Sequence, residues 1–239
     1  MSGLRPRLVP TLITVPAVFV CLALGAWQVH RLHWKEGLIA QRAAALAAPA
    51  AAPPETAADA RRREFHEIVT EGVLLNDRAL FVHAIGPEGG LGFDLLAPLR
   101  EEDGRIVFVD RGFVPAEQRD RVNRPEGVVR VAGRLRLPPA GKPGWFIPDN
   151  RPEQGEWFWI DLPAMARADH LAADGLTNIA PFYLAADPMP GPAGWPRGGA
   201  RLPELPNHHL QYAITWFSLA AAAAIIYFLS QRAGGGEDK

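Results

Sequence analysis

The chain has 239 residues, 48% of them hydrophobic, and a formal net charge of −1 at pH 7. This length suits one moderate domain together with membrane-spanning segments, and the near-neutral charge provides no basic surface for nucleic acid. The single cysteine, Cys21, excludes an internal disulfide and a cysteine-based metal site.

The first predicted element is an apolar helix over residues 8–29, preceded by Arg5 and Arg7. A secretory signal peptide is the alternative interpretation, with Ala23-Leu24-Gly25 as its cleavage site. Signal-peptide apolar cores are usually about 7–15 residues long, and this run is longer. We therefore expect a retained transmembrane helix. The few residues ahead of it leave no room for a mitochondrial transit peptide, which favours a bacterial membrane.

Aromatic and basic side chains gather where this helix would leave the bilayer. Trp27, Arg31 and Trp34 follow one another at i, i+4 and i+7, so they share one face of a continuing helix. They fit the aromatic and basic belt of a membrane interface. They also fit a second interpretation, in which Trp27 and Arg31 form the wall of a pocket for a flat anionic ligand.

An Ala/Pro-rich spacer over residues 43–60 precedes a region of strands, over residues 63–187. Val129, Val131 and Leu135 alternate with polar residues, as in a half-buried strand. Further strands are predicted at Phe65–Leu75, Arg78–Ala84, Gly92–Leu99, Arg105–Val114, Glu156–Ile160 and Pro181–Ala185, with one short helix at Leu162–His170. Short strands at this spacing predict a mainly antiparallel, barrel- or sandwich-like domain.

Enzyme chemistry is disfavoured in this domain. It contains neither serine nor cysteine, so the activated nucleophile of a serine or cysteine hydrolase is missing. No phosphate-binding glycine loop ends in the Lys-Ser/Thr pair of a P-loop. His66, His83 and His170 are isolated in the sequence and are interpreted as strand-surface residues. We therefore expect a protein that is not an enzyme.

A Pro/Gly-rich connector over residues 188–206 leads to a second predicted transmembrane helix over residues 210–229. This run contains no Asp, Glu, Lys or Arg, and about 20 apolar residues span a bilayer core of roughly 30 Å. The predicted fold is therefore a membrane protein in which two transmembrane helices flank the soluble β domain.

His208 and His209 precede the second span at the membrane edge, where a metal-capable side chain is a functional candidate. Adjacent helical residues point about 100° apart, so the two histidines are not expected to share a metal. His209 shares a face with Tyr212 and Trp216, which suits an axial ligand of haem. The haem propionates would then lie near Arg31 or Lys35. In the alternative, both histidines face water or lipid headgroups and the aromatic residues form an interfacial belt.

Several motifs in the same order resemble one known family. They are Gly25-x-Trp27-Gln28-x-x-Arg31-x-x-Trp34-Lys35, Val109-Asp110-Arg111-Gly112-Phe113-Val114-Pro115, Pro148-Asp149-Asn150-Arg151-Pro152-Glu153, Trp157-Phe158-Trp159-Ile160-Asp161-Leu162 and Asn207-x-His209-Leu210-x-Tyr212-Ala213-x-Thr215-Trp216-Phe217. The chain resembles the surfeit locus protein family, membrane factors for the assembly of haem-copper cytochrome c oxidase. The resemblance covers most of the chain apart from the spacer.

The resemblance implies an assembly factor that binds haem a and aids its delivery to, or retention in, oxidase subunit I. It implies a bacterial inner-membrane location, with the soluble domain in the periplasm and both termini in the cytoplasm. Oxidase subunit I, other assembly factors and the lipid bilayer are the expected partners. A haem-free membrane chaperone that stabilises oxidase subunits is the alternative.

The resemblance also implies the site. It places the iron ligand on His209, and the expected haem-binding residues are His209, Tyr212, Trp216, Trp27 and Arg31. His208, His30 and His33 fall at positions that the family motifs leave open, so the ligand role is not transferred to them. Arg111 and Gly112 are interpreted as a turn and its brace rather than as ligand contacts.

Overall fold

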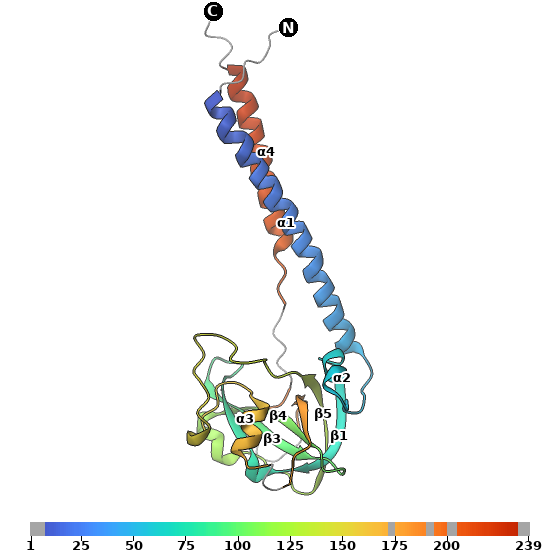
Figure 1. The fold of residues 1–239 in the computed structure, drawn as a ribbon. Helices are drawn as coiled ribbons and strands as arrows, with labels where there is room; N and C mark the ends of the chain where they lie inside the picture. The colour runs from blue at the N-terminus through green and yellow to red at the C-terminus, as the bar shows by residue number, and fades with distance from the viewer. Residues whose placement is uncertain (1–7, 172–174, 190–193, 200–204, 234–239) are drawn as a thin grey trace, which may run out of the picture. The chain divides into compact units, whose positions relative to one another are not determined.

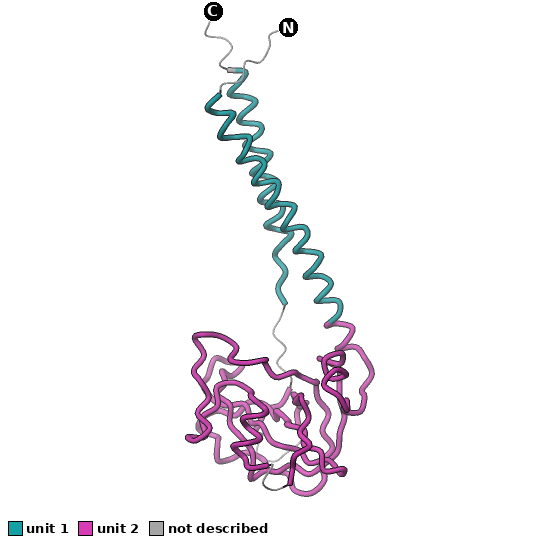
Figure 2. The backbone as a smooth tube through the Cα atoms, viewed as in Figure 1, with its two compact units in different colours: residues 1–41, 203–239 teal, residues 42–202 magenta. Residues whose placement is uncertain are grey.

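The computed structural model describes residues 8–171, 175–189, 194–199 and 205–233. The chain divides into two compact units, which are described separately (Figure 2). The first unit comprises residues 1–41 and 203–239, and the second comprises residues 42–202. The predicted connector over residues 188–206 falls partly outside the described residues.

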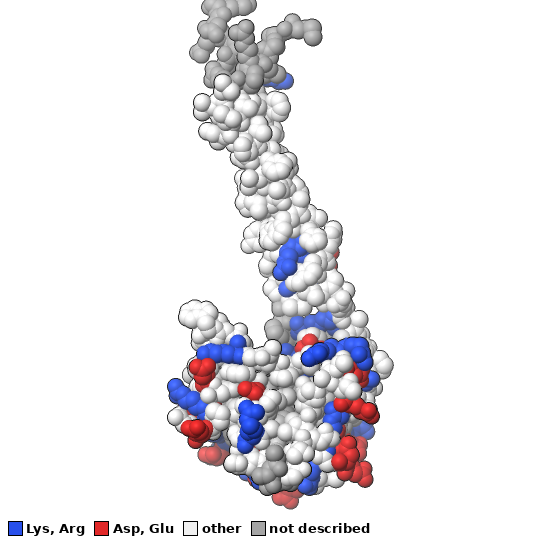
Figure 3. Space-filling view, viewed as in Figure 1, with Lys and Arg blue, Asp and Glu red and all other residues white. Residues whose placement is uncertain are grey.

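Two long apolar helices dominate the first unit, α1 (Leu8–Ala47) and α4 (His209–Ala233) (Figure 1). Each is long enough and apolar enough to cross a bilayer, and most of its residues are not buried by protein. Most of the visible surface of the two helices carries no charge, whereas charged side chains gather over the second unit (Figure 3). The helix α1 continues beyond the predicted span of residues 8–29, and no proline interrupts it between Pro16 and Pro49.

Within this unit α1 and α4 run antiparallel and touch through small residues. Gly25, Ala213 and Ala220 are buried, as expected where transmembrane helices approach each other closely. A Cβ atom on Gly25 would lie 2.7 Å from the ring of Phe217, so only glycine fits this contact without movement of the ring. Near the other end of the pair, Thr11 Oγ1 and Tyr227 Oη form a 2.7 Å hydrogen bond.

The second unit contains a closed, mainly antiparallel barrel. Its strands are β1 (Glu67–Leu74), β2 (Leu80–Ile85), β3 (Leu91–Arg100), β4 (Ile106–Pro115), β5 (Val128–Arg136) and β6 (Ile179–Ala186). They pair in the order β1-β5-β6-β4-β3-β2, and pairing of β1 with β3 closes five of them into a barrel. The pair β4–β6 is parallel, and the other pairs are antiparallel. The predicted fold class is thus confirmed.

Successive residues of β4 point to opposite faces of the strand and contribute to two separate parts of the hydrophobic core. Val107 and Val109 lie in clusters that draw side chains from all five barrel strands, so these clusters fill the barrel. Ile106 and Phe108 pack on the opposite face, against Trp157 and the short helix α3 (Leu162–Ala168). Because both faces of β4 are covered, four consecutive residues at its start are buried.

Short helical segments complete the unit. A further helix, α2 (Ala57–Arg62), begins within the predicted spacer, where the Thr56 side chain accepts a hydrogen bond from the Asp59 amide. Three 3-10 turns lie at η1 (Asn76–Arg78), η2 (Ala116–Arg121) and η3 (Pro152–Gln154). Asp161 caps α3 in the same way, by accepting from the Ala164 amide at 3.0 Å.

The predicted strand at Glu156–Ile160 is wrong. Asn150 Oδ1 accepts hydrogen bonds from the amides of Phe158 (2.8 Å) and Trp159 (3.2 Å), and Asn150 Nδ2 donates to the Trp159 carbonyl (3.0 Å). The side chain of Asn150 therefore supplies hydrogen bonds that a neighbouring strand would otherwise provide. The segment makes only isolated bridges, from Glu156 to Arg151 and from Trp157 to Val82 in β2.

Candidate functional site

His209 and Gln28 meet where α4 begins beside α1. His209 is the first residue of α4, and its Nδ1 atom lies 2.7 Å from Oε1 of Gln28. Both side chains are half-buried. The two residues are 181 positions apart in the sequence and are brought together by the antiparallel pairing of the helices.

This contact determines which nitrogen of His209 carries the proton. An amide oxygen only accepts hydrogen bonds, so Nδ1 must be the donor. In the neutral imidazole, Nε2 then keeps its lone pair. No hydrogen bond to Nε2 occurs within the part of the chain that the structure describes. The imidazole is therefore oriented as metal-binding histidines usually are, with one nitrogen held by an acceptor and the other available as a ligand.

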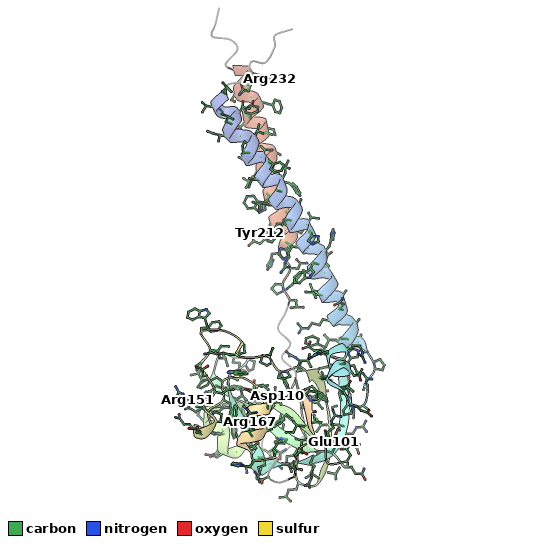
Figure 4. All side chains as sticks on the ribbon, in the orientation of Figure 1. Glu101, Asp110, Arg151, Arg167, Tyr212 and Arg232 are labelled. Atoms are coloured by element: carbon green, nitrogen blue, oxygen red, sulfur yellow. The ribbon has the colours of Figure 1, made fainter. Side chains whose placement is uncertain are left out.

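Aromatic residues surround this pair on the two helices. Trp27 precedes Gln28 on α1, and Tyr212 lies one turn after His209 on α4 (Figure 4). Both side chains are 55% exposed, whereas Trp216 is half-buried. Each of these aromatic residues thus lies within two helical turns of His209 or Gln28 along its own helix.

Arg31 lies one turn beyond Gln28 on α1. Its guanidinium carbon lies 3.6 Å above the ring centre of Trp34, a cation–π contact that restrains the long side chain. The predicted grouping of Arg31 with Trp34 on one helix face is therefore present. The edge of the Arg31 guanidinium can still donate hydrogen bonds to a carboxylate.

The donors available here suit a ligand that brings most of its own coordination sphere. No group of three or more His, Cys, Asp or Glu residues gathers around a common point among the described residues. A bare ion would thus have too few protein ligands, whereas a haem iron already has four nitrogens from its macrocycle, so that one imidazole would suffice to hold it. The buried Oδ1 atom of Asn207, two residues before His209, has no hydrogen-bond partner, so a donor on a bound ligand could satisfy it. The residues present fit a haem with His209 as its axial ligand.

The remaining sequence-predicted histidines lie elsewhere. His83 is on β2, where its ring stacks on Phe158 with the ring centres 4.6 Å apart. His170 follows α3 with a positive φ of 53°, so it ends a helix rather than lying on a strand. His66 Nδ1 lies 3.5 Å from the Glu64 carbonyl oxygen, just before β1.

Gln28 was not predicted from the sequence as the partner of His209. Its signal was a polar amide inside the otherwise apolar run of residues 8–29, a position where a polar group usually has a partner. The identity of that partner depends on the rotation and register of the two helices, which the sequence pattern does not specify.

Comparisons with known proteins identify the family. A model described as the SURF1 family matches residues 15–221. The chain belongs to this family. A SURF1-like protein of Monosiga brevicollis is 34% identical, over 94% of this chain and 87% of its own length. Surfeit locus protein 1 of Homo sapiens is 30% identical, over 91% of this chain and 75% of its own. A SURF1-like protein of Drosophila melanogaster is 29% identical, over 91% and 75%.

The SURF1 family match extends over the parts of the chain described above. Residues 15–221 include most of α1, the whole barrel and the first half of α4, and therefore both Gln28 and His209. The resemblance drawn from the motifs is thus confirmed at the level of the family.

Proposed function

We propose that this SURF1 family member is an assembly factor of haem-copper cytochrome c oxidase, which binds haem a through His209 and aids its delivery to or retention in subunit I. The observation that carries the proposal is the 2.7 Å hydrogen bond from His209 Nδ1 to Gln28 Oε1, because it leaves Nε2 available to iron. The protein acts by binding and transfer rather than by catalysis.

The imidazole of His209 is only half-buried, which suits a protein that must release the haem it has bound. A single protein ligand holds the iron through one bond, and the exposed rings of Trp27 and Tyr212 offer apolar contact to the macrocycle. Arg31, held over Trp34, is positioned on the same helix to pair with a propionate. Two axial protein ligands and a closed pocket would instead favour permanent retention.

The proposal includes a location and partners. The two apolar helices anchor the chain in a bacterial inner membrane, with the barrel in the periplasm and both termini in the cytoplasm. In this arrangement His209 lies at the periplasmic edge of the bilayer. Subunit I of the oxidase and other assembly factors are the proposed partners.

The test is the visible spectrum of the detergent-purified full chain from cells that make haem a. The unchanged protein should show Soret and alpha bands, and His209→Ala should lose them while remaining folded and inserted. His208→Ala is the matched control, since His208 is the adjacent, exposed imidazole, and it should keep the bands. Gln28→Leu should bind haem about 10–100-fold more weakly, because the ligand loses the acceptor that orients it.

Full haem occupancy in His209→Ala would show that the ligand assignment is wrong. A colourless parent protein that still co-purifies with an oxidase subunit would instead support the haem-free chaperone. In that case His209 and Gln28 would serve only as a polar contact between two helices.

A further inference from the structure

The strand β4 contains a bulge at Arg111 and Gly112. Pairing with β3 passes from Leu96↔Asp110 to Asp94↔Phe113, so two residues of β4 face the single residue Leu95 of β3. The Gly112 amide donates to Asp110 Oδ1 at 2.9 Å, and Gly112 has a φ of 104°. Such bulges redirect a side chain that a regular strand would place elsewhere. The segment is therefore a bulge within a strand, not the turn and brace that the sequence suggested.

The redirected side chain of Arg111 is buried and unpaired. Only 2% of Arg111 is exposed, and its Nε atom has no hydrogen-bond partner. Across residues 8–171, 175–189, 194–199 and 205–233, no carboxylate forms an ion pair with its guanidinium. Burial lowers the pKa of Arg111 to about 10, so the group stays charged at neutral pH. A buried charge without a partner is costly, and a bound anion would remove that cost.

Arg111 lines a cavity of about 360 Å³. The other walls include Asn123, Met189, Trp195, Arg197 and Gly198, and no Asp or Glu is among the described residues that line it. The guanidinium carbon of Arg197 lies 4.4 Å above the ring centre of Trp195. The lining thus combines two positive charges with an amide and an aromatic ring.

Backbone hydrogen bonds fix the segment that forms the outer wall. Phe113 and Arg197 exchange hydrogen bonds of 3.2 and 2.9 Å, and the Asn123 amide donates to the Trp195 carbonyl at 2.9 Å. A Cβ atom on Gly112 would collide with the Arg197 carbonyl, so the glycine is required for this close approach. The cavity is therefore a built feature of the second unit, not a gap between loose loops.

We propose that this cavity binds an oxyanion, either a carboxylate or a phosphate group, through the guanidinium of Arg111. The planar guanidinium can hold two oxygens of such a group at once, which a lysine cannot do. The ring of Trp195 offers apolar surface to the remainder of the molecule to which the carboxylate or phosphate group belongs. The source of the group is either a small soluble molecule or the headgroup of an anionic lipid. The cavity belongs to the second unit, whereas His209 belongs to the first.

Thermal unfolding of the full chain in a neutral detergent tests the proposal. Inorganic phosphate or acetate, added at constant ionic strength to ten times its Kd, should raise the Tm of the second unit by about 3–5 °C. Arg111→Met should abolish this shift. Without the anion the Tm of Arg111→Met should equal or exceed that of the parent, because an unpaired buried charge has been replaced by an apolar side chain of similar length.

Two further variants keep the test decisive. Arg130→Met removes an exposed arginine of β5 and should keep the full response to phosphate. Arg111→Lys keeps the charge and should show a reduced response, so it reports on the site even if Arg111→Met folds poorly. A Tm of the parent that does not respond to either anion or to lipid, or an equal response in Arg111→Met, would overturn the proposal.

A comparison of two lipid compositions distinguishes a soluble anion from an anionic lipid headgroup. The same proteins are placed in nanodiscs of phosphatidylcholine with and without phosphatidylglycerol. A shift that depends on Arg111 and requires phosphatidylglycerol, with no shift from free phosphate or acetate, identifies a headgroup. A shift from the free anions alone identifies a soluble ligand.

Discussion

At the scale of single residues, the candidate sites of this chain lie at polar side chains that are partly or fully buried and have hydrogen-bonding atoms without a partner. His209 could be singled out from the sequence because aromatic residues follow it at helical spacing and a family motif includes it. The family motifs also include Gln28 and Arg111, but the sequence does not show what lies beside them: a histidine 181 residues away for Gln28, and a cavity with no carboxylate among its described lining residues for Arg111. Pairing across such distances is a property of the fold, not of a local pattern.

Asp169 should make the stability of the second unit depend on pH. Burial raises the pKa of its carboxyl to about 6, although the charge of nearby Arg78 lowers it. Its Oδ2 atom is buried without a hydrogen-bond partner. Because the folded-state pKa lies above the unfolded value of about 3.9, folding is favoured at low pH and this contribution is lost as the pH rises through 6.

Asp169→Asn removes the ionisation and should therefore raise the Tm at pH 7.5 by about 2–4 °C. The difference from the parent should shrink as the pH falls towards 4, where both side chains are neutral. Scanning fluorimetry across this pH range measures it. Asp149→Asn, at a carboxylate whose side chain is 84% exposed, is the control and should show no comparable trend. A constant difference for Asp169→Asn at every pH would contradict the assignment.

At the scale of elements, strands in which apolar and polar residues alternate could be predicted from the sequence. Segments whose backbone is hydrogen-bonded by a side chain instead of a neighbouring strand could not. The alternating residues of β5 predicted a strand, and the structure places one at Val128–Arg136. Glu156–Ile160 has the same kind of composition, yet Asn150 takes the hydrogen bonds of two of its residues and no strand forms. The closure of the barrel by β1 and β3 was also beyond the sequence, because it depends on the register of only two residue pairs.

Gly25 should be essential for the close approach of α1 and α4. A leucine there would displace the Phe217 ring and separate the helices, which would break the hydrogen bond between Gln28 and His209. Gly25→Leu should therefore lower the thermal stability of the helix pair and reduce haem binding together. Gly37→Leu, on the same helix with open space around its Cα atom, should change neither. Equal behaviour of the two variants would show that the helices do not depend on this contact.

At the scale of the whole molecule, two apolar helices separated by one globular unit require both chain ends to be on the same side of any membrane that the helices span. The charge pattern of the sequence did not give the orientation, since long translocated domains largely escape the positive-inside rule. The orientation proposed here can be measured directly with cysteine labelling. The only native cysteine, Cys21, lies inside α1 and can be replaced by alanine to remove background.

In that background, Lys142→Cys should react with a membrane-impermeant maleimide in intact bacterial spheroplasts. Lys142 is exposed, in a loop of the second unit. Ser230→Cys, near the end of α4, should react only after the cells are opened. The reverse pattern would place the barrel in the cytoplasm and would remove the proposed access of the second unit to periplasmic partners.

The position of β6 has a consequence for how the chain folds during synthesis. Among the described strands, β6 is the last in the chain, and it lies between β4 and β5 and pairs with both. Until residue 186 has been synthesised, β4 and β5 each present an unpaired edge to the surroundings, which is the condition in which strands aggregate. The earlier strands can pair only as an open sheet, in which β1 joins β5 to β3 and β3 joins β2 and β4, and a single late strand closes it. A chain interrupted before residue 179 would keep both edges open and would be a target for proteases rather than a partly active protein.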